Sequence, residues 1–221
     1  AIQDWTAEQP GSAELDGVVG SYCRVIDHAR PGVDEAYFAA LDAGFPEYLA
    51  GLSGSARRSV FHRRKFLESL GPVELRMAAP HEVKDFLQDL NRLHALRWGE
   101  PVFTGHRLAF HEDLAARMAS QDRLRLSRLV VDGQVVSVLY DLRGGRNEYN
   151  LQMGFDDGFH RGKISLGLLH LGYAIERASE EGIDKVDLLA GPGKQGLFKQ
   201  RIAPGSERFL RRHYLNSSRA R

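Results

Sequence analysis

The stretch from Arg146 to Leu171 constrains the fold of this 221-residue chain more than any other. Its first eight residues alternate between apolar and polar side chains, which is typical of a strand with one buried face. The side chains expected on one face are Tyr149, Leu151 and Met153, and those expected on the other are Glu148, Asn150 and Gln152. A loop with three glycines follows, and Ser165 is expected to cap a helix. Because a helix start carries unsatisfied N–H groups and partial positive charge, the pattern indicates a phosphate cradle.

Composition narrows the class of protein. The formal charge of +1 argues against a surface that binds nucleic acid over its whole extent. Binding through a local basic cluster stays an open alternative. The single cysteine, Cys23, excludes an internal disulfide framework and a cysteine-based metal cluster, and it suits a reducing, cytoplasmic location. The nine histidines lack ligand spacing, so no metal site is expected. The longest apolar run, from Ile164 to Ile175, is shorter than a membrane span.

The first third of the chain is less regular. Residues 34–43 and 45–52 are predicted to form two short helices, with Pro46 at the first position of the second helix. A longer helix is predicted from residue 56 to 69. Its cationic or titratable side chains are Arg57, Arg58, His62, Arg63, Arg64 and Lys65. Two interpretations stay open for this run, a solvated helix face or a contact with phosphate or nucleic acid.

From Gly71 onward the element order is clear. The predicted elements are a strand at 73–77, helices at 80–98 and 110–120, a hairpin at 124–131 and 134–142, a strand at 146–153, a helix at 165–181, a strand at 183–189, a short helix at 197–202 and a strand at 207–215. The hairpin rests on Asp132-Gly133, a dipeptide favoured in tight turns. The chain therefore reads as strand, two helices, three-strand meander, helix, strand, helix and strand.

This order resembles the GNAT acyltransferase fold, and five short motifs strengthen the resemblance. They are Tyr48–Ser53 before the arginine-rich run, Leu93–Trp98, Gln152–Asp156, Ser165–Gly167, and Asp187–Gly191 with the pair Phe198-Lys199 behind it. Together they are similar to the FemAB/CelD-like branch of that superfamily, which implies a bacterial protein. The resemblance implies an α/β (α+β) fold: a central, mixed, mostly antiparallel twisted sheet flanked by helices, with one diverging parallel strand pair.

The resemblance covers about residues 45–215 and sets the expected domain limits. Residues 56–221 are expected to form the GNAT-like acyltransferase domain, and residues 1–55 an N-terminal extension. Full members of the branch often carry a second, N-terminal GNAT-like half, so the extension is interpreted as a remnant of it. The expected partners are accordingly a second copy of the chain in a homodimer, or a missing N-terminal half.

The resemblance also implies a donor site. In this fold the parallel strands beside the site diverge, which frees backbone groups near Met153 and Gly154 to bind the acyl carbonyl. The pyrophosphate of acetyl-CoA or another acyl-CoA is expected on the residues that follow, namely Arg161, Gly162, Lys163, Ser165, Leu166 and Gly167. The segment departs from the superfamily signature, Gln or Arg followed by x-x-Gly-x-Gly or Ala. Aminoacyl-tRNA therefore remains a second candidate donor, with tRNA contacts through residues 57–65.

Three side chains are the candidate catalytic residues. Lys199 follows Phe198, where relatives place an aromatic–lysine pair near the transferred group; the alternative is an ordinary surface lysine. Asp187 is expected to face the site or, alternatively, to bond a neighbouring loop at the sheet edge. Gln152 is expected to contact substrate from the polar face of its strand, which otherwise faces solvent.

Two functions of different class follow. The first is an acyltransferase that moves an acyl or aminoacyl group from a thioester or ester donor to an amine, in envelope or polysaccharide biosynthesis. The second is a catalytically silent GNAT-like module that binds a ligand or pairs with a partner. The altered pyrophosphate signature favours the second function, whereas Asp187 and the Phe198-Lys199 pair favour the first.

Overall fold

The structure is a computed structural model that describes the backbone of residues 5–6, 23–27, 35–162, 164–190, 194–210 and 212–216. Side chains are described for residues 35–160, 164–190 and 198–207. The chain divides into two compact units: a larger one, Ala39–Asp187, and a smaller one that joins Ala1–Phe38 to Leu188–Arg221.

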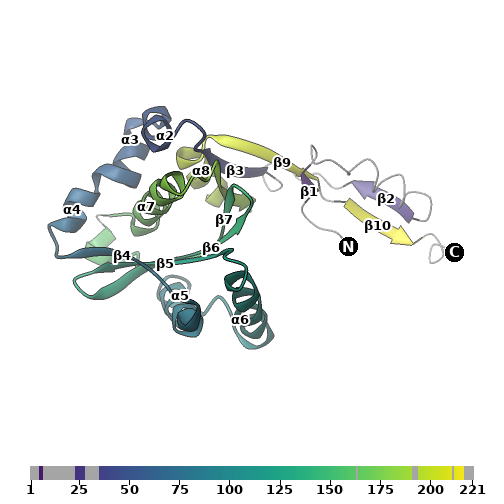
Figure 1. Cartoon of the computed structure of the whole chain (residues 1–221), viewed down its shortest axis with the longest axis horizontal. Coiled ribbons are helices and arrows are strands. Elements are labelled where there is room, and N and C mark those ends of the chain that lie inside the picture. The colour runs from purple at the N-terminus through teal and green to yellow at the C-terminus, as the bar shows by residue number, and fades with distance from the viewer. Residues whose placement is uncertain are drawn as a thin grey trace. The chain divides into compact units, whose positions relative to one another are not determined.

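The larger unit holds most of the predicted elements (Figure 1). In chain order they are α2 (Phe45–Gly51), α3 (Gly54–Arg57), the π-helix η1 (Arg58–His62), α4 (Arg64–Glu68), β4 (Val73–Met77), η2 (Pro80–Glu82), α5 (Val83–Trp98), α6 (Gly105–Ala119), β5 (Leu124–Val131), β6 (Gln134–Gly144), β7 (Asn147–Phe155), η3 (Phe159–Gly162) and α7 (Leu166–Glu180). The strand β8 (Lys185–Ala190) begins in this unit and continues into the smaller one.

The strands of the larger unit form a sheet in the order β8-β7-β6-β5-β4. The β4–β5, β5–β6 and β6–β7 pairs are antiparallel, whereas β7 and β8 are parallel. The α7 crossover makes this parallel pairing feasible, because two parallel strands need a long connection. The turn between β5 and β6 uses Asp132 and Gly133, both at positive φ, as the sequence predicted. The predicted mixed, mostly antiparallel sheet with one parallel strand pair is confirmed.

Helices cover both faces of this sheet. Figure 1 shows α5 and α6 on one side of the β4–β7 strands and α7 on the other. Phe86 and Leu90 of α5 join Tyr140 of β6 in one apolar cluster. On the opposite face, Leu169 of α7 and Leu129 of β5 belong to a second cluster. The central strands β5 and β6 are buried almost continuously, because helices cover both of their faces.

The smaller unit contains short strands and one helix. Its elements are β1 (Trp5–Thr6), β2 (Cys23–Asp27), most of β3 (Glu35–Ala40), the end of β8, α8 (Lys194–Ile202), β9 (Gly205–Leu210) and β10 (Arg212–Asn216). The β9 strand pairs antiparallel with β3 and with β1, and β10 pairs with β2.

Two helix predictions are wrong. The helix predicted at 34–43 is instead the strand β3, because pairing with β9, far away in the sequence, overrides the local preference of Glu and Ala for helix. The single helix predicted at 56–69 is broken into α3, η1 and α4. The π-helix lies where α7 approaches most closely: a Cβ built on Gly172 would lie 1.9 Å from the Val60 carbonyl oxygen.

Candidate functional site

The parallel strands β7 and β8 pair only at their first residues. Three residue pairs join them, from Asn147 with Lys185 to Tyr149 with Asp187. Beyond Tyr149, β7 continues to Phe155 while the described pairing with β8 has ended. The predicted parallel pairing of β7 and β8 is confirmed. Because only three residue pairs join the two strands, the pairing agrees with strands that diverge at their carboxyl ends.

A β-bulge occurs just after this last pair. Across β6, Asn150 lies opposite Asp141 and Gln152 lies opposite Tyr140, so Leu151 is an extra residue in β7. A bulge bends its strand and increases the local twist, which provides a physical reason for β7 to leave β8 at this point.

The bulge also changes which side chains share a face. Residues directly opposite one another in an antiparallel pair point to the same side of the sheet. Gln152 therefore shares the α5 side with Tyr140, whereas Asn150 shares the α7 side with Asp141. The expectation that Glu148, Asn150 and Gln152 share one face is wrong, because the bulge sends Gln152 to the other side. Glu148 and Asn150 are buried, so the alternative of a solvent-facing side does not hold for them.

The predicted pyrophosphate residues lie at and before the start of α7. Ser165 occupies the N-cap position, as predicted, but its side chain makes no capping hydrogen bond and no acidic residue lies in the first turn. The free backbone N–H groups of the first turn of α7 therefore have neither a side-chain cap nor an acidic side chain of the same helix turn to offset their partial positive charge. Leu166 is fully buried and fixes the helix start in the core beside Ile164. Of the loop residues, Arg161 and Gly162 belong to η3, while Lys163 and the side chain of Arg161 lie outside the described residues.

Two glycines of the predicted site allow close packing. A Cβ on Gly154 would lie 3.1–3.2 Å from atoms of Leu90 and Leu93, so its absence lets α5 pack tightly on β7. A Cβ on Gly167 would lie 2.6 Å from the ring of Phe155. The first turn of α7 therefore packs directly against the end of β7, which brings Met153, Gly154 and the helix start into one region.

Asp187 is almost completely buried, with a side-chain exposure of 2%, and its Oδ2 lies 3.6 Å from Nζ of Lys185. Both residues belong to the part of β8 that pairs with β7. The carboxylate of Asp187 is therefore a buried group beside a lysine of the same strand. Burial of this kind is common for functional carboxylates and also for structural ion pairs.

Lys199 is held by the backbone at the end of β8. Its Nζ donates a hydrogen bond of 2.7 Å to the carbonyl oxygen of Leu189. Leu189 has a φ of 57°, which is rare for a residue with a branched side chain. Non-glycine residues in this conformation cost free energy and often mark functional sites. The side chain of Lys199 is half-buried.

Sequence reasoning missed two polar groups on the α5 side. The hydroxyl of Tyr140 and Nδ1 of His111 are buried and have no hydrogen-bond partner within the described residues. Burial raises the pKa of Tyr140 to about 12 and lowers the pKa of His111. Their rings meet edge to face with centroids 5.7 Å apart, and Gln152 lies across from Tyr140 in the register. No motif signals them, because each lies within an ordinary helix or strand pattern.

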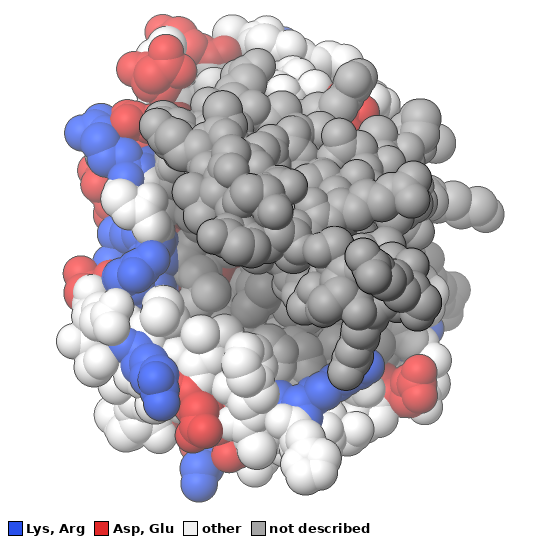
Figure 2. Space-filling model, turned by 90° about the vertical axis from the view of Figure 1, so that its right-hand side faces the viewer, with Lys and Arg blue, Asp and Glu red and all other residues white. Residues whose placement is uncertain are grey.

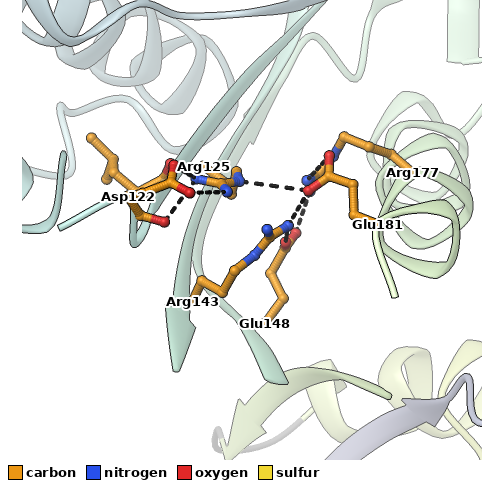
Figure 3. Close-up of polar contacts among 7 residues, drawn as sticks. Asp122, Arg125, Arg143, Glu148, Arg177 and Glu181 are labelled. Carbon is orange, nitrogen blue, oxygen red and sulfur yellow. Dashed lines mark hydrogen bonds and ion pairs between the residues drawn. The ribbon is translucent and has the colours of Figure 1, made fainter. Parts of the chain in front are cut away.

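The α7 side of the sheet carries a network of buried charge (Figure 3). Glu148 accepts hydrogen bonds from Arg143 and Arg177, and its side chain has no exposed surface. Both arginines also bond Glu181, and Arg125 joins Glu181 to Asp122. This network ties α7 to β6 and β7 below it.

Two further titratable groups lie buried on the same face. The Nδ2 atom of Asn150 donates a 2.6 Å hydrogen bond to Oδ1 of Asp141, and burial together with the charge of Glu148 raises the pKa of Asp141 to about 8. His170 of α7 bonds Ser127 through Nε2 at 3.0 Å and Ser137 through Nδ1 at 2.9 Å. Burial, with the nearby charge of Arg177, lowers the pKa of His170 to about 3.

The basic run at 57–65 is divided between interior and surface. Arg57 donates to the carbonyl oxygens of Ala50 and Leu52, which end α2. Arg64 pairs with Glu176 and lies 3.8 Å over the ring of Tyr173. Arg58, His62, Arg63 and Lys65 are exposed.

On the face drawn in Figure 2, basic and acidic side chains alternate over the described part. No cluster of three or more His, Cys, Asp or Glu suited to a metal occurs among the described residues. Within the same residues, no helix is both long enough and apolar enough to cross a membrane.

The fold and the region around β7 and α7 are those of an acyltransferase family, which a family model identifies. The family model of the acetyltransferase (GNAT) domain matches residues 54–199, and the chain belongs to this family. The match begins at α3 and ends at Lys199, so it spans the meander, the α7 crossover and α8 as far as Lys199.

Several solved structures share this fold at low sequence identity. The chain is similar to FemX, with 12% identity, a TM-score of 0.71 and coverage of 97% of this chain and 71% of FemX. L-PGS from Bacillus licheniformis matches with 15% identity, a TM-score of 0.62 and coverage of 97% and 67%. A conserved protein from Bacteroides thetaiotaomicron matches with 12% identity, a TM-score of 0.62 and coverage of 92% and 66%. The chain thus spans about two thirds of each of these structures, and the similarity is consistent with a FemAB-like branch. No match was found among curated proteins.

Proposed function

We propose that the chain is an N-acyltransferase that moves an acyl or aminoacyl group from a thioester or ester donor to an amine acceptor. The observation that carries the proposal is the early end of the β7–β8 pairing at Tyr149 and Asp187, followed by the bulge at Leu151. Backbone groups on the free edge of β7 are then available to an acyl carbonyl. Membership of the GNAT family supports this use of the free edge.

The donor is proposed to lie along β7 and the start of α7. Amides near Met153 and Gly154 would bind the acyl carbonyl, and N–H groups at Ser165, Leu166 and Gly167 would bind phosphate, with Arg161, Gly162 and Lys163 beside them. The uncapped α7 start supports this assignment because an anion would satisfy its N–H groups. Acetyl-CoA or another acyl-CoA is the preferred donor, and aminoacyl-tRNA is the competing one.

The proposed chemistry needs a neutral amine, a stabilised oxyanion and a proton for the leaving group. Lys199 is proposed to stabilise the negative charge that develops on the carbonyl oxygen; its hydrogen bond to Leu189 would fix the position of its ammonium group. Asp187 is proposed to orient the attacking amine or help to deprotonate it. Gln152 is proposed to contact the acceptor from the α5 side.

The cellular role is proposed from the FemAB-like resemblance. The acceptor would be an amine on an envelope or polysaccharide precursor, and the reaction would occur in the cytoplasm. Residues 56–221 would carry the catalytic function, with residues 1–55 as an extension and a second copy or an N-terminal half as partner. If the donor is a tRNA, the exposed part of the 57–65 run is the proposed contact.

A donor screen tests the proposal. The chain is mixed with acyl-CoAs or aminoacyl-tRNAs and a panel of amines, and the acylated product is identified by mass spectrometry. In parallel, a bound donor at 100 times its dissociation constant should stabilise the chain by about 2.7 kcal/mol. Product formation with one donor class identifies it, whereas neither product nor stabilisation with any donor would refute the enzyme.

A second candidate is a catalytically silent GNAT-like module that binds a ligand or a partner. The observation that favours it is the segment Arg161–Gly167, in which Ile164 and Leu166 replace signature glycines; both are buried. Stabilisation by a donor without any transfer would support this candidate over the first.

A further inference from the structure

The bulge in β7 needs something to fix its position, because an extra residue can be accommodated at more than one point of a ladder. Moving the extra residue by one position would exchange the faces of the intervening side chains. It would also alter which backbone amides point toward the free edge of β7. The position of the bulge at Leu151 therefore determines what the strand presents from Gln152 to Gly154.

One buried side-chain pair lies next to the bulge on the α7 side of the sheet. Asn150 precedes the extra residue, and its Nδ2 donates 2.6 Å to Oδ1 of the directly opposite Asp141. Asp141 and Asn150 retain exposures of 2% and 7%. The hydrogen bond therefore joins the last residue pair of the regular ladder before the bulge.

A polar pair at this core position lowers the stability of the fold relative to apolar side chains. The arginines nearest to Asp141 bond other carboxylates, because Arg143 and Arg177 both donate to Glu148 and Glu181. The second oxygen of Asp141, Oδ2, is buried and has no partner in the described residues. A polar group left in this state costs free energy relative to an apolar side chain. Buried polar pairs that lower stability can instead specify register.

We propose that Asp141 and Asn150 are positioning residues that fix the bulge at Leu151 and thereby align the Gln152–Gly154 backbone with the acyl donor. Neither side chain touches the donor in this scheme. The catalytic half of the inference rests on the proposed acyl transfer, while the structural half does not. The two can therefore be tested separately.

The decisive variant is the double replacement Asp141→Leu with Asn150→Leu. Removing both polar partners in favour of apolar side chains is expected to leave the stability equal or higher. Hydrogen–deuterium exchange of the 151–154 amides should nevertheless accelerate at least ~10-fold, because the bulge is no longer fixed. Turnover at saturating donor should fall on the order of a hundredfold, since small misplacement of a binding strand has effects of that size.

Two controls separate positioning from general damage. Asp141→Asn keeps an oxygen that accepts from Asn150, so its exchange and turnover should stay within a few-fold of the parent. Ser127→Ala removes a buried hydrogen bond to His170 on the same face, away from the bulge, and should leave exchange at 151–154 unchanged. Parent-like exchange in the double variant would overturn the proposal. If the parent itself transfers no acyl group, the proposed function fails, but the exchange result still decides the role of the pair.

Discussion

Arg177 of α7 donates from Nη2 to Oε1 of Glu148, a carboxylate whose side chain has no exposed surface (Figure 3). Glu148 also accepts from Nη2 of Arg143 at 3.2 Å, so two cations from different elements neutralise one buried anion. The carboxylate is thus stable in the interior only while α7 lies in place. The contact links the crossover helix to the strand that is proposed to bind the acyl group.

Loss of Arg177 should destabilise the larger unit strongly. Arg177→Met leaves Glu148 buried with one cation fewer, and breaking a buried pair in this way costs about 3–5 kcal/mol. Urea unfolding monitored by circular dichroism measures the change. Arg146→Met is the control, because the Arg146–Asp184 pair is exposed on both sides and should contribute less than about 1 kcal/mol. Equal effects of the two variants would contradict this account.

Asp141 should make the free energy of unfolding fall as pH rises from about 4 to 8. Its pKa is about 8 in the folded state, because of burial and the charge of Glu148, and near 3.8 when unfolded. Between these values the folded state retains a proton that the unfolded state releases, so its contribution is complete below 3.8 and lost as pH passes 8. From pH 6.5 to 8 the free energy of unfolding should drop by up to about 1.4 kcal/mol per unit. Asp141→Asn should flatten this slope in urea titrations; an unchanged slope would refute the assignment.

His170 should act in the opposite direction at lower pH. Burial, followed by the charge of Arg177, lowers its pKa to about 3, so it stays neutral in the fold while the unfolded imidazole takes up a proton below about 6.5. Its contribution is present above 6.5 and is lost as pH falls toward 3. From pH 6.5 to 4 this change opposes that of Asp141. Comparing the double variant Asp141→Asn with His170→Gln against Asp141→Asn alone isolates the contribution of His170. Acid unfolding should begin at a lower pH in the double variant. The same acid midpoint in both proteins would show that His170 does not set it.

Lys199→Met tests the proposed oxyanion group. Removing one comparable donor lowers turnover about 10²- to 10³-fold, and we expect that loss at saturating donor with affinity for the donor within a few-fold of the parent. Arg201→Met, on the same helix and exposed, is the matched control. A parent rate for Lys199→Met would exclude a catalytic role, and a change confined to the Michaelis constant would indicate a binding lysine.

Replacements within the basic run at 57–65 can distinguish a contact with tRNA from a contribution to the stability of the fold. If a tRNA donor binds there, replacing exposed Arg58 and Arg63 by Gln should reduce the slope of log affinity against log salt by about 1–2. Replacing Arg57 and Arg64, whose groups bond within the fold, should lower the unfolding midpoint instead. Binding that is independent of salt and of Arg58 and Arg63 would favour the solvated-face interpretation.

Patterns that depend on neighbouring residues were predictable from the sequence. The Asp132-Gly133 hairpin, the amphipathic helix that became α5 and the strand–loop–helix at 146–171 each have a local signature. Their order, with the motifs from Leu93 to Lys199, indicated the family that the domain match confirms. The parallel β7–β8 pairing followed from the helix between the two strands.

Tertiary structure alone decided the points on which the site depends. Local composition indicated a helix at 34–43, but pairing with β9 made it the strand β3. Period-two alternation placed Gln152 beside Asn150, whereas the bulge at Leu151 sends them to opposite faces. The protonated Asp141 and the neutral His170 likewise depend on groups contributed by other elements. The physical reason is common to all of these: ladder register and burial are set by contacts between residues far apart in the chain, and a local pattern carries no information about them.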